Sequence, residues 1–600
     1  MTRPVLPLLA LLLATGAAAA QPAQPLTLER IMADPDWIGP PVEQAWWSWD
    51  GQRAYYALKR DGSSVRDLYV QDVAGGDARL VDGASRAGVD AADPAYDASR
   101  ARMAFVRNGD VFVRDLRSGA LVQLTRSDAA ESSPRWGSDG ALVWRSGHDW
   151  YRWSAQDGAT AQAASPRAED DPAAPPKPDA LREEQLRLVD TLRNERERRE
   201  AARRQEADWR RADPTRAPAP VYLGKDVEIA ATALSPDGRW LFVATERKSE
   251  DRGQLGKMPK YVTESGYEEF EDVRTRVGRN LPRAQTFWLV DVRDGSRREL
   301  EPDALPGIAD DPLAKLRKAA GKDPLKGNRP LRVEEGGDNG IHWSADSRFL
   351  ALMLHSVDNK DRWLATVEPA AATLQSRHRL SDAAWINWDY NDFGWLPDQR
   401  TLWLLSEESG WSHLYTVDAA RGGRARALTS GRWEVSQPAL SPDGARFHFT
   451  CNRARPGAYE LCTVPADGGE VRELTRLGGV EGFAVSPDAS RILLRHSSSY
   501  VPPQLAVLGA DGNGLRTLTD TRKPEYRAFE WLPPDYVQVP SKHGAGTIWG
   551  KYYGPKALEP GRKYPVALFV HGAGYLQNVS DRWPNYFREQ MFHNLLVQRG

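Results

Sequence analysis

The sequence has 600 residues, which is enough chain for several domains. Its 50 glycines and 42 prolines are too few for a collagen-like or low-complexity chain, and 55 aromatic residues favour a β-rich protein. The net charge of −2 provides no general basic field, so nucleic acid is not an expected partner.

The chain begins with the features of an export signal. Arg3 supplies a positive charge, an apolar run follows from Val5 to Ala14, and Ala17 to Ala20 offer small residues for cleavage. This run is shorter than the roughly 18 residues of a membrane helix, and no later stretch approaches that length. We expect a signal peptide over residues 1–20, a mature chain without a membrane span, and an exported protein, periplasmic or secreted. A buried N-terminal helix is the alternative.

The marker of internal repetition is a turn of the Ser-Pro-Asp-Gly type that precedes an alternating apolar strand. Proline presets the backbone of such a turn, aspartate accepts local amide hydrogens, and glycine adopts positive φ. Clear copies begin at Ser235, Ser441 and Ser486, and weaker copies surround Asp50, Asp97, Asp139, Asp346 and Asp398.

The spacing of these turns predicts a β-propeller. Measured between the aspartates, five of the seven intervals (47, 42, 98, 109, 52, 45 and 45 residues) lie near the length of one four-stranded blade. A second strand with a polar turn lies between most markers, as in DLYVQDVAGGD. Eight markers therefore predict about eight blades, with the hairpins of a β-sandwich as the alternative.

Two insertions account for the long intervals. Residues 164–220 contain an Arg/Glu-rich run in which Leu181, Leu188 and Leu192 recur at roughly helical spacing, so we expect a helix or helical hairpin with a narrow apolar stripe. Residues 247–282 are expected to elaborate another blade loop.

The only two cysteines, Cys451 and Cys462, are too few for a disulfide framework or a metal cluster, and no metal is expected. Pro456 and Gly457 lie between them and favour a hairpin with the cysteines on neighbouring strands. A disulfide in an oxidising compartment and two buried thiols are the two open alternatives.

The sequence pattern changes after Arg522, where the marker turns stop. The apolar run from Val566 to Val570 does not alternate, which predicts a strand buried on both faces of a parallel α/β sheet. It ends in His571-Gly572-Ala573-Gly574-Tyr575, and a helix with Phe587, Met591 and Leu595 on one side is expected to follow. Glycines after such a strand let a backbone amide approach a developing oxyanion, although a tight turn is the alternative.

An exported chain with these turns, followed by LFVHGAGY, resembles the prolyl oligopeptidase family of serine peptidases, in particular its dipeptidyl-peptidase IV-like branch. SEESGWSHLYTVD from Ser406 and HDWY from His148 agree with it. The resemblance implies a mainly β fold: an eight-bladed propeller over about 46–524 that gates access, then the first part of an α/β-hydrolase domain over 525–600. Residues 21–45 are expected to pack on the hydrolase domain.

In that family the catalytic serine, aspartate and histidine follow the oxyanion loop. The motif G-x-S-x-G is absent from these residues, so no catalytic residue is assigned, the triad is expected beyond Gly600, and this chain itself is expected to be inactive. The loop from His571 to Tyr575 is the candidate oxyanion element, and the amide of Gly572 or Ala573 or a side chain remains open as the donor.

The resemblance also implies a glutamate pair that binds the free ammonium of the substrate. In this branch the pair follows an Asp-Trp motif, but Tyr151 and Arg152 stand after Asp149-Trp150. The substitutes are Glu183-Glu184 and Glu268-Glu269, with Glu334-Glu335 and Glu407-Glu408 as further pairs.

The function implied is an exported serine peptidase that cleaves short peptides, as a dipeptidyl or oligopeptidyl aminopeptidase acting by acyl transfer. Its expected partners are a peptide substrate and, in a homodimer, a second copy, and it requires no cofactor. The alternative is a non-catalytic, TolB-like periplasmic propeller that binds a protein partner. That scaffold accounts for residues 46–520 but not for Pro565 to Gly600.

Overall fold

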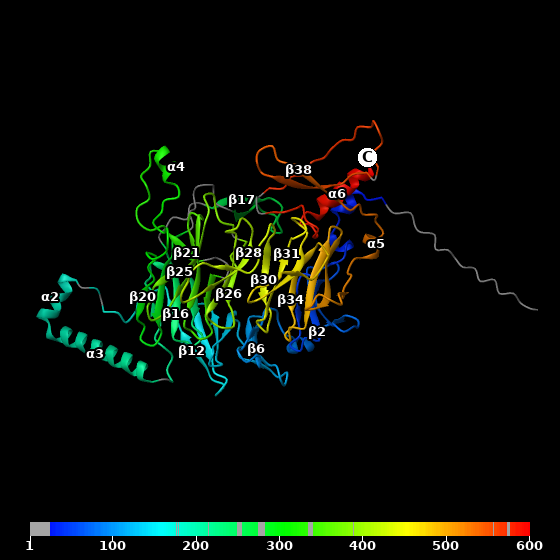
Figure 1. Ribbon diagram of the computed structural model, residues 1–600. Helices are drawn as coiled ribbons and strands as arrows, with labels where there is room; N and C mark the ends of the chain where they lie inside the picture. The colour runs from blue at the N-terminus through cyan, green and yellow to red at the C-terminus, as the bar shows by residue number, and fades with distance from the viewer. Residues whose placement is uncertain are drawn as a thin grey trace, which may run out of the picture.

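The computed structural model describes most of the chain after residue 24 (Figure 1). The described residues are 25–175, 177, 179–213, 215–248, 255–273, 283–333, 340–387, 389–555, 557–572 and 576–600. The expected signal peptide over residues 1–20 lies outside them. Every helix in these ranges is too short or too polar to cross a bilayer.

The first half of the described chain forms four antiparallel blades, each ordered from its first strand to its fourth. Blade 1 comprises β1 (Ala45–Trp47), β2 (Arg53–Lys59), β3 (Arg66–Asp72) and β4 (Arg79–Leu80), and blade 2 comprises β5 (Ala95–Tyr96), β6 (Arg102–Arg107), β7 (Asp110–Asp115) and β8 (Leu121–Gln123). Blade 3 comprises β9 (Glu131–Trp136), β10 (Leu142–Ser146), β11 (Asp149–Trp153) and β12 (Thr160–Ala164), and blade 4 comprises β15 (Val227–Leu234), β16 (Trp240–Arg247), β19 (Thr286–Asp291) and β20 (Arg297–Glu299).

Four further blades complete the ring, so the prediction of an eight-bladed propeller is confirmed. Blade 5 comprises β21 (Leu331–Val333), β22 (Ile341–Trp343), β23 (Leu350–Ser356), β24 (Asp361–Val367) and β25 (Leu374–Ser381), and blade 6 comprises β26 (Phe393–Trp395), β27 (Thr401–Ser406), β28 (His413–Asp418) and β29 (Arg426–Ala427). Blade 7 comprises β30 (Val435–Leu440), β31 (Arg446–Cys451), β32 (Glu460–Pro465) and β33 (Arg472–Glu473), and blade 8 comprises β34 (Val480–Val485), β35 (Arg491–Ser498), β36 (Val501–Gly509) and β37 (Arg516–Thr517).

Each marker turn lies between the inner strand of a blade and the next strand. In blade 4 the Ser235 hydroxyl donates to Asp237 Oδ1 (2.5 Å), which also accepts the Arg239 amide (3.0 Å). The same oxygen of Ser235 accepts the Trp240 amide (2.8 Å), and Gly238 adopts φ +79°. Because the serine and aspartate side chains bond to amides of the same turn, the chain reverses through local bonds, and the Asp237 amide adds a bond to Ser347 Oγ of blade 5 (3.0 Å).

The marker turns also join blades that are distant in sequence. The Arg100 guanidinium donates to the carbonyl oxygens of Pro442 (2.5 Å) and Pro487 (2.9 Å), so blade 2 contacts the turns of blades 7 and 8. The Ser138 amide of blade 3 donates to Ala345 O of blade 5 (3.0 Å). These bonds tie the ring together at the end that carries the turns.

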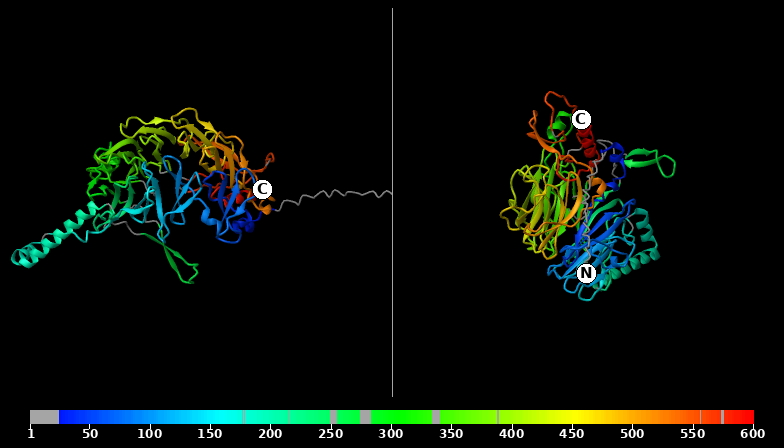
Figure 2. Two further views of the ribbon diagram at one scale, coloured as in Figure 1. Left: turned by 90° about the horizontal axis from the view of Figure 1, so that it is seen from below. Right: turned by 90° about the vertical axis from the view of Figure 1, so that its right-hand side faces the viewer.

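The insertions leave the propeller body as separate arms (Figure 2). Residues 164–220 hold the helical hairpin that the sequence predicts, and none of its side chains is buried. The additional elements of the propeller region are η2 (Ser85–Gly88), β13 (Pro166–Arg167), α2 (Ala180–Leu188), α3 (Asp190–Ala212), β14 (Val221–Tyr222), β17 (Gly256–Lys260), β18 (Glu269–Val273) and α4 (Ala314–Ala319).

The N-terminal residues pack against the C-terminal residues. Leu26, Ile31 and Trp37 share one buried cluster with Tyr526 and Met591. The elements outside the blades here are α1 (Leu28–Met32), η1 (Pro35–Trp37), α5 (Pro524–Arg527), β38 (Asp535–Pro540), β39 (Thr547–Tyr552) and α6 (Phe587–Gln598). Helix α6 confirms the helix expected there, with Met591 and Leu595 buried.

The prediction of a buried strand from Val566 to Val570 is wrong for this structure. The run forms no strand, and Val566, Leu568 and Val570 are 91%, 86% and 75% exposed. The physical reason is the absence of a partner: the described residues pair β38 only with β39, and no parallel strand lies beside the run. An apolar run cannot bury itself without neighbouring strands.

The marker turn predicts the effect of Asp237→Ala. The substitution removes the acceptor of two hydrogen bonds, so we expect the free energy of unfolding to fall by about 1–2 kcal/mol in urea denaturation. The exposed Asp323→Ala serves as the control. Equal stability of the two variants would contradict this account of the turn.

Candidate functional site

Residues 577–583, which follow the predicted oxyanion loop, dock on blades 7 and 8. The Asp581 carboxylate accepts two bonds from Arg455 (2.5 and 2.6 Å), and its backbone amide donates to Gly457 O (2.9 Å). The Trp583 amide donates to Ser497 Oγ (2.8 Å). This combination of an ion pair with backbone bonds fixes both the position and the direction of the segment.

The turn of blade 7 that receives the segment is closed by a disulfide. Cys451 ends β31, Cys462 lies in β32, and the two are bonded with their Cα atoms 6.0 Å apart. Arg455, Gly457 and Tyr459 all lie between them. The covalent link therefore limits the motion of the very residues that contact 577–583.

The predicted oxyanion loop lies only partly within the described residues. His571 and Gly572 are described, and a ring nitrogen of His571 bonds to the Gly572 carbonyl (2.8 Å). Ala573, Gly574 and Tyr575 lie outside the described residues. Because Gln577 accepts a hydrogen bond from the Tyr459 hydroxyl (2.6 Å), the chain leaving the loop is held beside blade 7.

An acidic cluster lies next to this docking site. It consists of Glu407 from the turn after β27, Glu434 just before β30, and Asp389 from the loop between blades 5 and 6. Tyr390 and Tyr459 interact electrostatically with Glu434, and Tyr390 also interacts with Glu407 and Asp389. Tyr459 thus belongs both to the surroundings of the cluster and to the contact with Gln577.

Glu407 is the residue of the cluster whose ionisation its surroundings change. Burial, followed by the charge of Glu434, raises the pKa of Glu407, and the guanidinium of Arg362 opposes this effect. The Glu434 carboxylate is held by the Asn452 amide, which donates to Oε2 (3.0 Å). Partly buried like charges of this kind are stabilised by a cation that arrives between them.

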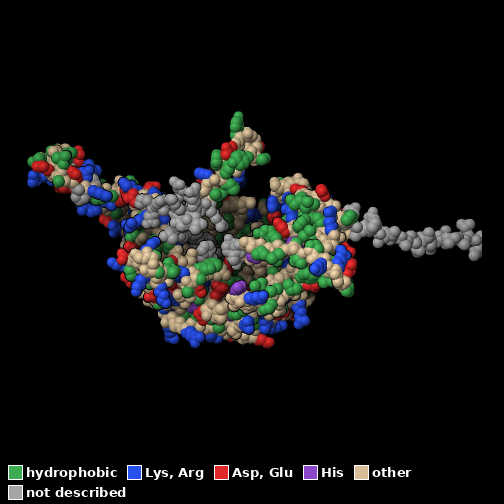
Figure 3. Space-filling view, turned by 90° about the horizontal axis from the view of Figure 1, so that it is seen from above, with side chains coloured by type: hydrophobic (Ala, Val, Ile, Leu, Met, Phe, Trp, Pro, Cys, Tyr) green, Lys and Arg blue, Asp and Glu red, His purple; other side chains and the backbone are tan. Residues whose placement is uncertain are grey.

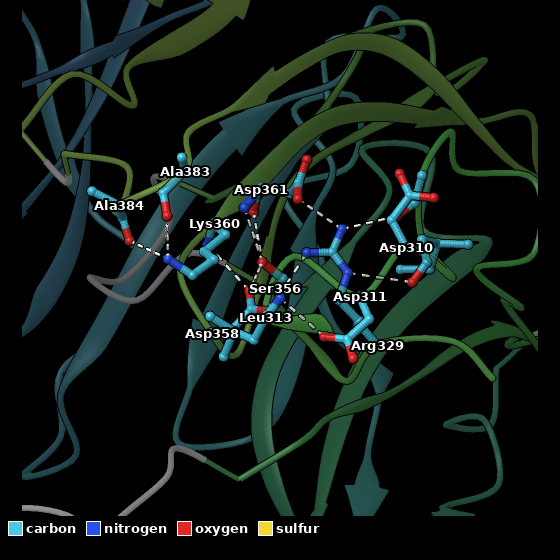
Figure 4. Close-up of polar contacts among 12 residues, drawn as sticks. Asp310, Asp311, Leu313, Arg329, Ser356, Asp358, Lys360, Asp361, Ala383 and Ala384 are labelled. Carbon is cyan, nitrogen blue, oxygen red and sulfur yellow. Dashed lines mark hydrogen bonds and ion pairs between the residues drawn. The ribbon is translucent and has the colours of Figure 1, made fainter. Parts of the chain in front are cut away.

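Buried cations of blade 5 hold the loop that carries Asp389 and Tyr390. Lys360 Nζ donates to the carbonyls of Ala383 (2.6 Å) and Ala384 (2.5 Å), as Figure 4 shows. Arg362, itself 1% exposed, donates to Tyr390 O (2.7 Å). The loop therefore has little freedom to move away from Glu407.

The same network fixes the long segment before β21. The Arg329 guanidinium, which is buried, pairs with Asp361 (2.7 Å; Figure 4). It also donates to Gly307 O (2.9 Å). Asp361 also accepts from Arg379 (2.7 Å). Breaking one partner of such a network would leave a buried charge uncompensated.

The structure does not bring the predicted ammonium ligands to this site. Glu183 and Glu184 lie on the exposed arm of α2 and pair with Arg196 (2.9 Å) and Arg187 (3.4 Å). Glu268 and Glu269 belong to the hairpin of β17 and β18, which projects from the body as the green hairpin of Figure 2, left. Projections from the body are also seen in the space-filling view of Figure 3. Glu334 and Glu335 lie outside the described residues.

Sequence reasoning noted Glu407 only as one half of Glu407-Glu408 and did not single out Glu434. Glu408 turns away and bonds to His378 Nε2 (2.7 Å), so adjacency in the sequence did not identify the pair. The SEESGW motif was the available signal, because a motif in a blade loop next to a docking surface favours a functional role.

Comparison with known proteins shows that part of the chain is similar to dipeptidyl peptidases. Residues 338–503 match the family model described as dipeptidyl peptidase IV N-terminal region. A probable dipeptidyl peptidase 4 of Aspergillus flavus is 26% identical over 185 residues, 30% of this chain and 24% of that protein. Dipeptidyl peptidase 8 of Homo sapiens is 27% identical over 180 residues, 27% of this chain and 20% of that protein. The matched region thus spans about a quarter or less of these relatives.

A solved structure shares the fold over most of the chain. The crystal structure of Porphyromonas gingivalis dipeptidyl peptidase 4 superposes with a TM-score of 0.56 at 15% identity, covering 95% of this chain and 72% of that one. At this identity the likeness establishes a common fold.

The docking contact predicts the effect of Gly457→Ala. A Cβ at Gly457, whose φ is +87°, would lie 2.0 Å from Val579 O, so the methyl group must displace the docked segment. We expect faster hydrogen exchange in a peptide covering 577–583. Gly410→Ala is a matched control, because Gly410 has the same φ of +87° and nothing within 4 Å of its added Cβ. Equal exchange in both variants would contradict the contact.

Proposed function

We propose, from the premise that this chain is dipeptidyl peptidase IV-like, that it forms the propeller and the start of the hydrolase domain of an exported serine peptidase that removes dipeptides from the free N-terminus of short peptides. The observation that carries the proposal is the acidic cluster of Glu407, Glu434 and Asp389 beside the docked residues 577–583.

In this proposal the cluster binds the ammonium group of the substrate. An ammonium has three donors and one positive charge, which satisfy two carboxylates that repel each other when the site is empty. Arg362 and Lys360 hold the surrounding loop, so the carboxylates are positioned before the substrate arrives. Binding one end of the peptide at a fixed place determines which peptide bond reaches the nucleophile.

The docked residues 577–583 position the end of the site at which the peptide carbonyl would react. A backbone amide of the loop from His571 to Tyr575 would stabilise the oxyanion that forms when a serine attacks the peptide carbonyl. The serine would transfer its proton to a histidine, form an acyl ester and release the shortened peptide, and water would then free the dipeptide. The propeller would admit only short or flexible peptides to this space.

The location of the nucleophile can be tested directly. We expect a longer chain that includes G-x-S-x-G after residue 600 to react with a fluorophosphonate and to release dipeptides. The 600-residue chain is expected to do neither. Labelling of a serine within residues 25–600 would contradict the proposed position of the nucleophile.

Glu407→Gln in the longer chain tests the ammonium site. Loss of a charge-assisted bond worth about 1.5–3 kcal/mol should lower kcat/KM for a peptide with a free N-terminus by about 10- to 100-fold. An N-acetylated peptide should be a poor substrate of both enzymes. Because the pKa of Glu407 is raised, kcat/KM of the wild-type enzyme should fall on acidification at a pH above the usual glutamate pKa of about 4.3. This acid limb of the pH profile should shift in the variant.

Two exposed glutamates provide matched controls. Glu183→Gln and Glu269→Gln change the same functional group on the projecting arms and should leave kcat/KM unchanged. If one of these variants loses activity while Glu407→Gln retains it, the ammonium lies on an arm and the proposed site is wrong.

A further inference from the structure

The hairpin of β38 and β39 carries a partly buried lysine that the proposed reaction does not use. Lys551 belongs to β39, and its register partner on β38 is Tyr536. Because directly paired residues of an antiparallel hairpin project to the same face, the two side chains are neighbours. The Lys551 amine donates to the hydroxyl of Ser499, in the turn between β35 and β36, at 3.4 Å. The amine therefore lies where the hairpin meets blade 8.

The surroundings of Lys551 include a guanidinium with an unused donor. Arg455 stacks on the Tyr536 ring, with Cζ 3.5 Å from the ring centroid, and pairs with Asp581 through Nη2 (2.5 and 2.6 Å). The Tyr536 hydroxyl also donates to Asp581. Arg455 Nη1 is buried and has no hydrogen-bond partner among the described residues. Because a buried cationic donor without a partner is unfavourable, this cluster lacks an acceptor at Nη1.

The environment of Lys551 favours the neutral form of its amine. Burial lowers the pKa of Lys551 to about 8, the charge of Arg455 acts in the same direction, and the charge of Asp581 opposes it. At pH 8 about half of such amines are neutral, whereas a lysine with the usual pKa of about 10.4 is about 0.4% neutral. The neutral fraction of Lys551 rises as the pH increases through about 8 and falls on acidification. The neutral amine is the nucleophilic form.

We propose that Lys551 is a carbamylation site that reacts reversibly with carbon dioxide. The amine nitrogen attacks the carbon of CO₂, an N–C bond forms, and one C=O electron pair moves onto oxygen. The nitrogen then releases a proton to water, so that amine and CO₂ become a carbamate and a proton without any redox change. The new carboxylate is the acceptor that Arg455 Nη1 lacks, and the Ser499 hydroxyl donates to its second oxygen.

The carbamate would add a link between the hairpin and the propeller. Asp581 remains bonded to Arg455 Nη2 and to the Tyr536 hydroxyl, so the carbamate uses the other nitrogen of the guanidinium. The bonds of the carbamate would therefore add to those that dock residues 577–583 on blades 7 and 8. Carbon dioxide would strengthen this docking whether or not the chain belongs to a peptidase.

Covalent trapping on the 600-residue chain tests the site. The chain is equilibrated at pH 8 with ¹³C-labelled bicarbonate and dissolved CO₂, carbamates are trapped as ethyl esters with triethyloxonium, and mass spectrometry measures the labelled fraction of each lysine. Lys542, exposed in the turn of the same hairpin, is the internal control. Because ordinary lysines carry less than about 1% neutral amine at this pH, we expect at least about tenfold more label on Lys551. The label should decrease at pH 6 when dissolved CO₂ is held constant.

A serine variant tests whether the surroundings hold the carbamate. Ser499→Ala removes the hydroxyl and leaves the Ser499 carbonyl to accept its bond from Gln590. We expect the label on Lys551 to fall severalfold, while Ser64→Ala, at an exposed position, should leave it unchanged. Label on Lys551 no greater than on Lys542, or label unaffected by Ser499→Ala, would overturn the proposal.

The effect on docking has a separate readout. Hydrogen exchange in a peptide covering 577–583 should slow in the wild type when CO₂ is supplied. It should not respond in Lys551→Arg, which keeps the positive charge but has no amine for CO₂. An equal response of the two proteins, or no response of the wild type, would contradict the link between the carbamate and the docked residues.

Discussion

The proposed functional site depends on the contact of residues 577–583 with blades 7 and 8. The Arg455–Asp581 ion pair and the backbone bond to Gly457 place the chain that leaves the predicted oxyanion loop against a turn closed by a disulfide. Gln590 and Asn594 of α6 add further bonds, to the Ser499 carbonyl and the Tyr500 hydroxyl of blade 8. The contact also holds Gln577, which follows the predicted oxyanion loop, against Tyr459, and the charge of Glu434 acts on Tyr459 in turn.

The propeller acts as a rigid support for that contact. In the marker turn of blade 4, Ser235 and Asp237 bond to amides of the same turn, and Arg100 links turns of three blades. Blade 5 adds the buried pair of Arg329 and Asp361 and the Lys360 bonds to the next loop. Local turn chemistry thus sets the blades, and a few buried cations set the loops between them.

The eight blades could be predicted from sequence because their signal is local. A serine or proline near an aspartate and a glycine determines a turn within four residues, and its repetition counts the blades. The hairpin that carries the two cysteines could be predicted for the same reason, since Pro456 and Gly457 mark its turn. The disulfide itself was left open, because pairing depends on the compartment as well as on distance.

The candidate site could not be predicted in the same way. Glu407 and Glu434 come from neighbouring blades 6 and 7, and it is the packing of these blades that brings them together. The run from Val566 to Val570 misled because an apolar stretch implies burial only where neighbouring strands exist. The sequence pattern did not predict the burial of a segment or the grouping of side chains where these depend on residues distant in the sequence.

A crystal structure of the longer chain with a bound dipeptide tests the account most directly. The account predicts the ammonium nitrogen of the dipeptide within about 3 Å of a carboxylate oxygen of Glu407 or Glu434. It also predicts that the dipeptide carboxylate, which derives from the scissile carbonyl, is directed toward the loop that follows Val570. An ammonium bound by Glu183, Glu184, Glu268 or Glu269, with Glu407 and Glu434 unoccupied, would contradict it.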